Sequence, residues 1–200
     1  MKHKTVVIDP PWPIKFGKPA ERFRRKSGKW KNLKGHSLDY DVQTIDDIRA
    51  FPIDNFADEE CILFLWVTTG KIDGIPIIKT GLEMLEQWGF TYHQIITWCK
   101  NTGFAVWSPF NSRTEHILVG YRGALPKVYG AMPNYFETAQ LKHSEKPAKF
   151  YQILRAWTPE PRIDIFARNA HEGFDGWGNE YVGDGPLQKY LGPLQEMLEG

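Results

Sequence analysis

The chain of 200 residues is long enough to bury one substantial core and short enough that a second full domain is not expected. Its longest apolar run, residues 61–67, is far below the ~20 residues that a helix needs to cross a bilayer. The formal net charge is only +1, which by itself argues against a nucleic-acid partner. These features predict one soluble domain without a membrane span.

Cysteine and histidine usage excludes two further classes of protein. The two cysteines, Cys61 and Cys99, each lie in a strand-like run, as small buried hydrophobes do, rather than in a disulfide framework. Metal-ligand spacings such as paired CxxC or HExxH are absent from the sequence, and the six histidines are scattered. We therefore expect a reducing compartment, the cytoplasm, and no structural or catalytic metal.

The first predicted elements alternate between strand and helix. Residues 5–9 form a β-branched run that two prolines end, because proline continues neither a ladder nor a helix. Thr44 and Asp47 have the spacing of a capping box, which opens a short helix ending near residue 50. Residues 61–67 are continuously apolar, as in a parallel strand that is buried on both faces.

The alternation continues to the end of the domain. Apolar residues at helical spacing predict a helix over residues 75–88, which Gly89 ends. Strands over 93–99 and 116–121, a helix over 146–157 and a central strand over 162–167 follow. This order indicates an α/β fold of the Rossmann-like kind, an open and mostly parallel sheet with helices on both faces.

The chain divides into a domain over residues 1–183 and a C-terminal tail over residues 184–200. Apolar residues of the tail recur at helical spacing, although a Gly-Pro pair interrupts them. We expect this amphipathic tail to dock on the core or on a second subunit.

Basic residues are concentrated in one segment, residues 15–36, which carries nine Lys and Arg against one acidic residue. The remainder of the chain is acidic, so the low net charge hides a strongly uneven distribution. Aromatic residues are interleaved with the basic ones. Such a segment is either a solvated loop or a grip that binds phosphates and stacks on bases, and the candidate contacts are Arg22, Arg24, Arg25 and Lys26.

The candidate catalytic residues are Asp9, Pro10, Pro11 and Trp12, at the end of the first strand. In open α/β sheets, ligands bind outside the carboxyl ends of the strands. The carboxylate of Asp9 and the carbonyl of Pro10 can each accept one hydrogen of an adenine exocyclic amine, which would aim the nitrogen lone pair at a methyl donor. Trp12 offers a face on which the base can stack. The alternative is a strand-ending turn followed by an ordinary core aromatic.

The sequence resembles the MT-A seventy (MT-A70) family of N6-adenine methyltransferases, whose hallmark is this DPPW tetrapeptide. The resemblance extends over nearly the whole chain, in family order: VVIDPPW, Tyr40 before TIDDIRAFPI, ILFLWVT, WGF, ITWCK, EHILVG, HSEKP, RIDIFAR and GWGNE. It implies the class I methyltransferase fold and S-adenosyl-L-methionine as the cofactor. It also implies that Asp9 to Trp12 bind the target adenine, with Tyr40 and Lys146 at the same pocket.

The resemblance also implies a cofactor-binding set: Asp9, Pro10, Phe166, Arg168, Asn179 and Glu180. In this set, Arg168 would bind the methionine carboxylate, and Asn179 and Glu180 the ribose hydroxyls. From the residues alone, the pattern instead favours a tight turn for GWGN, a helix cap for Ser144 and a solvated first-turn lysine for Lys146. The same two interpretations, an active-site residue or a structural one, apply to His143.

Two departures from the family pattern stand out. Only eight residues precede Asp9, where many members have another strand and an acidic cofactor contact. The FxGxG cofactor loop of many other amino-methyltransferases is replaced by residues 166–169, as is usual in this family.

We expect a DNA adenine-N6 methyltransferase that acts as a homodimer in a bacterial or phage setting, because the chain is short and shows no RNA-reading appendage. The alternatives are an RNA adenosine methyltransferase and a non-catalytic nucleic-acid-binding scaffold, against which the intact DPPW argues. A dinucleotide enzyme is disfavoured because no GxGxxG follows a strand.

Overall fold

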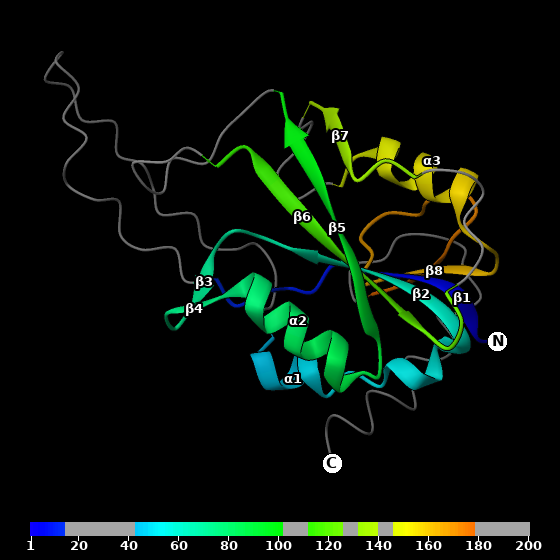
Figure 1. Ribbon diagram of the computed structural model, residues 1–200, viewed down its shortest axis with the longest axis horizontal. Coiled ribbons are helices and arrows are strands. Elements are labelled where there is room, and N and C mark those ends of the chain that lie inside the picture. The colour runs from blue at the N-terminus through cyan, green and yellow to red at the C-terminus, as the bar shows by residue number, and fades with distance from the viewer. Residues whose placement is uncertain (15–42, 102–111, 126–131, 140–145, 179–200) are drawn as a thin grey trace, which may run out of the picture.

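A seven-stranded sheet forms the centre of the protein in the computed structural model (Figure 1). The structure describes residues 1–14, 43–101, 112–125, 132–139 and 146–178. The strands of the sheet, in spatial order, are β7 (Tyr135–Thr138), β5 (Thr91–Lys100), β6 (Thr114–Arg122), β2 (Ala57–Val67), β1 (His3–Ile8), β8 (Arg162–Ile165) and β9 (Asp175–Trp177).

Most neighbouring strands are parallel, and β6 is the exception. β1 pairs in parallel with both β2 and β8, and β9 extends this part of the sheet beyond β8. β6 runs antiparallel to β2 on one side and to β5 on the other. As a result, the first residues of β6 lie at the same edge of the sheet as the last residues of β1, β5 and β8.

From β1 the sheet extends in two directions: β2, β6, β5 and β7 follow on one side, and β8 and β9 follow on the other. The chain builds the first side before it returns to build the second. The boundary between β1 and β8 is therefore the point where the strand order reverses. A crevice forms at the carboxyl ends of the strands at such a point, and it is the usual ligand site of open α/β sheets. Asp9 directly follows β1 at this edge.

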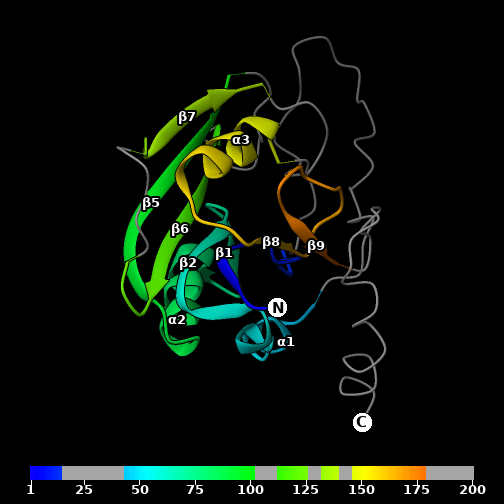
Figure 2. The same ribbon diagram turned by 90° about the vertical axis from the view of Figure 1, so that its right-hand side faces the viewer.

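Helices cover both faces of the sheet (Figure 2). α1 (Ile45–Arg49), the 3-10 turn Ile53–Asn55 and α2 (Ile77–Gln87) pack on one face, in a core that also includes Val6 and Ile8. α3 (Ala148–Trp157) packs on the other face, in a second core that includes Val7. Adjacent β1 residues point to opposite faces, which explains why the central strands read as continuous apolar runs.

Close packing fixes α2 against the sheet. A side chain at Gly81 would lie 2.8 Å from Val67 and 2.9 Å from Leu118, so only glycine lets the helix approach this closely. α1 begins with the predicted capping box, in which the Thr44 hydroxyl accepts from the Asp47 N–H and the Asp47 carboxylate accepts from the Thr44 N–H.

The fold class predicted from the sequence is confirmed, with differences in detail. β2 begins four residues before the apolar run that predicted it, and the last central strand ends at Ile165 rather than at residue 167. The prediction missed the short edge strands β7 and β9, and also β3 (Lys71–Ile72) and β4 (Ile75–Pro76), which pair in a separate small sheet. The alternative prediction of a tight turn over residues 176–179 is wrong for Gly176 and Trp177, because both belong to β9. Cys61 is buried, whereas Cys99 is only half-buried.

Candidate active site

The turn that carries Asp9 stays tied to the sheet. The Asp9 backbone N–H donates to the carbonyl of Ile165 at 3.3 Å, which links the turn to the end of β8. The carbonyl of Pro10 accepts the backbone N–H of Trp12 at 2.8 Å. A carbonyl oxygen has two lone pairs, so Pro10 keeps one acceptor position for another donor.

Trp12 is packed into the core beneath the turn. Only 5% of its surface is exposed, and its indole N–H donates to the carbonyl of Trp66 at 3.0 Å. The predicted stacking of a base on this ring is therefore not supported by the described residues, because almost no ring surface remains open. The structure favours the alternative, a core aromatic that anchors the turn from below.

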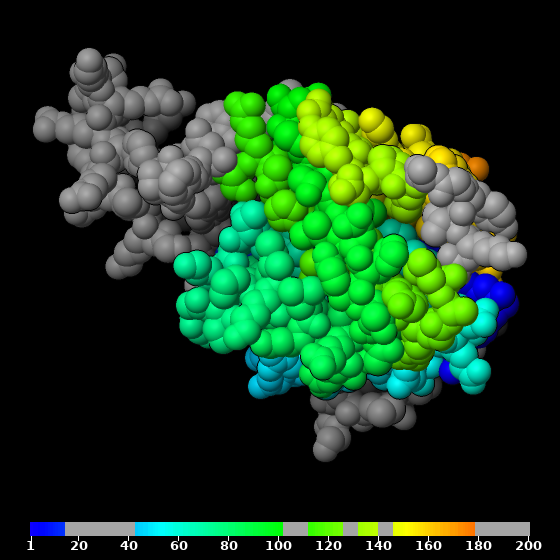
Figure 3. All heavy atoms as spheres, in the orientation of Figure 1, coloured from blue at the N-terminus to red at the C-terminus, as the bar shows by residue number. Residues whose placement is uncertain are grey.

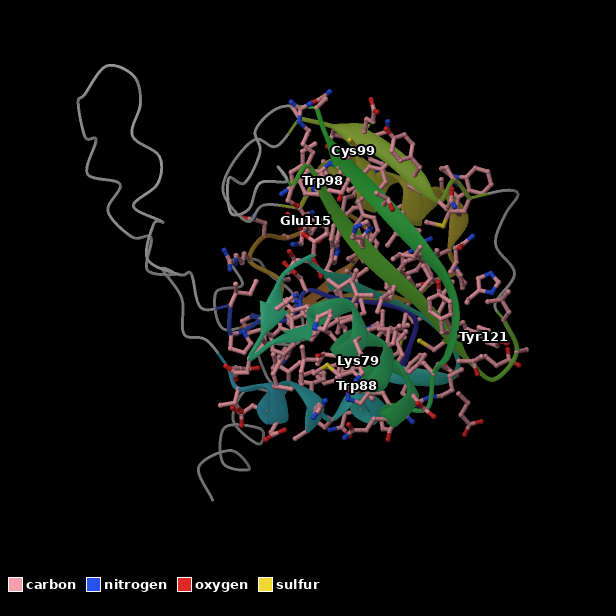
Figure 4. The ribbon with its side chains drawn as sticks, turned by 60° about the vertical axis from the view of Figure 1, so that its left-hand side comes forward. Lys79, Trp88, Trp98, Cys99, Glu115 and Tyr121 are labelled. Atoms are coloured by element: carbon pink, nitrogen blue, oxygen red, sulfur yellow. The ribbon has the colours of Figure 1, made fainter. Side chains whose placement is uncertain are left out.

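Four charged side chains of alternating sign meet at the carboxyl edge of the sheet. The Lys146 ammonium lies 3.0 Å from the Asp9 carboxylate and 3.2 Å from the Glu115 carboxylate. The other oxygen of Glu115 pairs with Lys100. Because β6 is antiparallel, Glu115 near its start lies opposite Trp98 near the end of β5, and Figure 4 shows these two side chains together.

The pKa values of this network follow from burial and from the neighbouring charges. Burial disfavours an ionised Glu115, but the ammonium groups of Lys146 and Lys100 outweigh it and lower the pKa of Glu115 to about 2. Burial also opposes the charge on Lys146, yet its two carboxylate partners raise its pKa. The pKa of Asp9 is raised by burial, against the opposing effect of Lys146. The network thus holds Lys146 as an ammonium ion between two acids.

Asp164 in β8 is a second acid near Asp9, in a different environment. Its carboxyl is buried and accepts the hydroxyl of Tyr151 at 2.8 Å, while its other oxygen has no hydrogen-bond partner among the described residues. Burial raises the pKa of Asp164 to about 8, and the Tyr151 hydrogen bond offsets this only in part. His171 stacks on Tyr151 with ring centroids 3.4 Å apart, and burial lowers its pKa to about 4.

The two acids border one small pocket at the crevice between β1 and β8. Its lining combines acidic, basic and aromatic side chains: Asp9, Lys146, Tyr151, Asp164, Phe166, Ala167, Arg168, Asn169 and His171. Phe166 adopts a positive φ of 62° directly after β8, and its ring packs against Phe51 and Trp177. This conformation is uncommon outside glycine and is typical of functional sites.

The structure brings four of the predicted site residues together: Asp9, Lys146, Phe166 and Arg168 all line this pocket. Several other predicted site residues lie outside the described residues, namely Tyr40, Arg22, Arg24, Arg25, Lys26, His143, Ser144, Asn179 and Glu180.

Sequence reasoning missed five residues of the site: Lys100, Glu115, Tyr151, Asp164 and His171. Three of them are charged residues within or at the end of apolar strands, and a charge in such a run is a signal that could have found them. Tyr151 and His171 carry no comparable signal, because only the fold brings helix α3 and the chain after β8 against Asp164.

Other features of the described residues add no competing site. A larger hollow of about 560 Å³ lies between α2 and β5, on the face that Figure 3 shows, but Glu86 is the only charged residue among the described ones that line it. Within the described ranges, no group of three or more potential ligands is placed to hold a metal ion. None of the described helices has the length and apolarity that a bilayer-crossing helix needs.

An acid that follows a central strand of a Rossmann-like sheet, beside a pocket of mixed charge, lies where such sheets bind small-molecule ligands. The sequence model of the MT-A70 family matches residues 3–180, and the chain belongs to this family. The resemblance seen in the sequence is thereby confirmed.

Individual relatives cover most of the chain. It is 29% identical over 192 residues to the type II methyltransferase M.MunI of a Mycoplasma species, a match that spans 90% of this chain and 78% of the relative. It is 28% identical to an MT-A70-like N(6)-adenosine-methyltransferase of Arabidopsis thaliana and 27% identical to the human N(6)-adenine-specific methyltransferase METTL4. These matches span 90% and 89% of this chain, but only 24% and 37% of the two relatives.

Proposed function

We propose that this protein transfers a methyl group from S-adenosyl-L-methionine to N6 of adenine in DNA. The observation that carries the proposal is the placement of Asp9 at the strand-order reversal, paired with Lys146 at 3.0 Å on the wall of a pocket of mixed charge. The expected class, an adenine-N6 methyltransferase, is confirmed by the family match and the relatives.

The residues of the pocket fit the amino-acid end of S-adenosyl-L-methionine. That end carries an ammonium and a carboxylate group, so it needs acceptors and cations close together. The unpartnered oxygen of Asp164, together with Asp9, supplies acceptors for the ammonium group. Lys146 and Arg168 supply positive charge for the carboxylate.

When bound, this cofactor supplies a methyl group that is activated by a sulfonium sulfur. The side chains of the turn then have to make the adenine amine nucleophilic, because its lone pair is delocalised into the ring. The Asp9 carboxylate accepts one amine hydrogen and the free lone pair of the Pro10 carbonyl accepts the other, which pulls the nitrogen toward tetrahedral geometry. Pro11 stiffens this turn, and Trp12 anchors it in the core.

Lys146 has a separate role in this proposal. The ionised form of Asp9 accepts the stronger hydrogen bond and is the form that can take up a proton, although burial raises its pKa. The neighbouring ammonium stabilises the ionised form. Because its pKa is raised, the Asp9 carboxylate also takes up the proton that the amine nitrogen loses after methylation more readily than an exposed carboxylate would.

The choice of DNA rests on the similarity to M.MunI, which extends over 78% of that type II methyltransferase. RNA is the second candidate substrate, because an N6-methyladenosine RNA methyltransferase, MTA1 of Cryphonectria parasitica, is 23% identical over 88% of this chain.

Parallel incubations test the proposal. The protein and methyl-labelled S-adenosyl-L-methionine are mixed with single- and double-stranded DNA and RNA of one sequence, and the nucleosides are identified by mass spectrometry. We expect N6-methyldeoxyadenosine from DNA, and no label in a control DNA with 2-aminopurine in place of adenine. Label in RNA alone would make the substrate RNA. Nucleic-acid binding without any transfer would identify a scaffold and overturn the proposal.

Two further parts of the proposal concern residues outside the described ranges. The basic segment over residues 15–36 begins three positions after Trp12, so we propose that it binds the phosphates of the nucleic acid. We also propose a homodimer, because one domain of this size offers little surface for a duplex, with the tail over residues 184–200 contributing to the contact. Light scattering at assay concentrations should give twice the monomer mass, and a fully active monomer would reject it.

A further inference from the structure

Lys100 is a partly buried cation that the proposed reaction does not use. It ends β5, its side chain is only 14% exposed, and its ammonium lies 5.0 Å from the centre of the Trp98 ring. Its ionic partner is Glu115, which no step of the proposed chemistry contacts. Removing a lysine ammonium this far from water costs free energy unless a neighbouring charge compensates it. The position of Lys100 is therefore favourable only because Glu115 pairs with it.

Lys100 and Lys146 occupy equivalent places around Glu115. The Lys146 ammonium lies 4.6 Å from the centre of the Trp66 ring, as Lys100 lies over Trp98, and the two indole rings pack edge to face. Each lysine pairs with one oxygen of the Glu115 carboxylate. The two cations therefore share one anion, and Lys146 alone of the two reaches onward to a second acid among the described residues.

Glu115 is close enough to Asp9 to influence it. Their carboxylates lie 3.2 Å and 3.0 Å from the same Lys146 nitrogen, and the charge of Glu115 acts to raise the pKa of Asp9. With both lysines present, two positive and two negative charges balance. Without Lys100, the network would have an excess negative charge next to Asp9, and Glu115 would compete more strongly for Lys146.

We infer that Lys100 is a positioning residue that neutralises Glu115 and thereby leaves Lys146 free to hold Asp9 in its ionised, reactive form. The inference rests on the proposed function in that Asp9 is taken as the reacting acid. Lys100 itself acts only through Glu115 and Lys146.

The charged groups around Asp9 determine the sign of the expected effect. Lys146 and Arg168 favour its ionised form, while burial and Glu115 oppose it. Asp164 shares the pocket, and the charge of Asp9 adds to the burial that raises the pKa of Asp164. The Tyr151 phenol also faces this group but stays neutral, because burial and Asp164 raise its pKa. Removing Lys100 therefore makes Asp9 harder to ionise, and removing the negative charge of Glu115 makes it easier.

The kinetic test compares the pH dependence of kcat/KM for Lys100→Met, Glu115→Gln and the double variant. Lys100→Met should move the acid limb to higher pH by about one unit, the size of shift that a neighbouring charge produces. Glu115→Gln should not move it upward. The double variant should return close to the wild-type profile, because the excess charge is gone. Lys100→Arg should retain the wild-type profile.

A matched control is Lys79→Met, which removes a lysine from the exposed Lys79–Glu83 pair on α2. Lys79 lies well away from Glu115 in Figure 4. This variant should leave the acid limb in place. If Lys100 had a purely structural role, Lys100→Met would lower kcat/KM at every pH without moving the acid limb. The double variant would then have a kcat/KM no higher than that of Lys100→Met.

A second readout does not require activity. Carbon-13 NMR of the aspartate carboxyls, with the Asp9 signal assigned by its loss in Asp9→Asn, follows the Asp9 titration directly in the free protein. Lys100→Met should raise the Asp9 midpoint by about one unit, and the double variant should restore it. An unchanged midpoint in Lys100→Met would overturn the inference. If the wild type methylates no nucleic acid, the proposed function fails while this titration still decides the role of Lys100.

Discussion

Asp9 directly follows β1, Asp164 lies in the neighbouring parallel strand β8, and both border the same pocket, yet their hydrogen-bonding partners differ. Asp9 has an ammonium partner at 3.0 Å. Asp164 accepts its hydrogen bond from a neutral phenol, and burial raises its pKa to about 8. Burial raises the pKa of both acids, but only Asp9 has an ammonium group within hydrogen-bonding distance to oppose this rise, so we predict that Asp9 is the anion and Asp164 the protonated acid at neutral pH.

This difference shows that burial alone does not decide the protonation of a carboxyl. A lysine network reaches Asp9 because β6 is antiparallel and brings Glu115 to the carboxyl edge, whereas Asp164 points toward the aromatic side of α3. Two acids on one pocket whose pKa values depend on different partners can take different roles: one accepts the reacting proton, and the other stays neutral.

The largest expected effect concerns the anchor below Asp9. Trp12→Ala should lower the free energy of unfolding by about 3–5 kcal/mol, as for other buried aromatic truncations. Trp12→Phe keeps an aromatic ring but loses the hydrogen bond to Trp66 and part of the ring volume, so it should cost about 1–2 kcal/mol, less than the alanine variant. Urea unfolding measures both. Unchanged stability together with a raised KM for DNA would instead restore the stacking role.

The next effect contrasts the two acids in catalysis. Asp9→Asn keeps the shape of the side chain but removes the anion, and should lower kcat/KM about 10²-fold or more. Asp164→Asn keeps a neutral group where a neutral carboxyl is expected, and should lose far less at neutral pH. Steady-state kinetics with circular dichroism as the folding control decides this. Near-wild-type turnover in Asp9→Asn would remove Asp9 from the mechanism.

The third effect is the pH dependence of stability. The pKa of Asp164 is raised in the folded protein, so between about pH 4 and 8 the folded state keeps a proton that the unfolded state releases. Stability therefore falls as pH rises through this window, by up to about 1.4 kcal/mol per unit.

Asp164→Asn should remove this slope, which urea unfolding at several pH values measures. The control Asp54→Asn alters an exposed carboxylate, and should change stability by a constant amount over the same range. Equal slopes in the wild type and Asp164→Asn would show that Asp164 is not held protonated.

The smallest effect concerns the basic segment over residues 15–36. Substitutions there should weaken nucleic-acid binding without changing the pKa of Asp9 or of Asp164. Replacing Arg22, Arg24, Arg25 and Lys26 with alanine should flatten the log–log salt dependence of duplex binding by about 0.9 for each phosphate that is no longer neutralised. The KM for DNA should rise while cofactor affinity stays constant. Fluorescence anisotropy over a salt series measures the slope, and an unchanged slope would assign the grip to another surface.

Sequence patterns predicted the fold well where strands are long and apolar, as in residues 61–67. They missed β7 and β9, because strands of three or four residues at a sheet edge carry too few side chains for a periodic signal. They identified Asp9 and Lys146 through the family motifs. Glu115 escaped because its partners are 15 and 31 residues away, and only the antiparallel register of β6 brings them together.

The opposite protonation of the two acids is the central claim, and one titration tests it most directly. In the aspartate carboxyl spectrum of the wild type, Asp9→Asn and Asp164→Asn each remove one signal and so assign both. We predict that at pH 7 the Asp9 signal is that of an anion, while the Asp164 signal is mainly that of a protonated acid and titrates near pH 8. Two carboxyls that titrate together, or an Asp164 that is already ionised at pH 5, would contradict this claim.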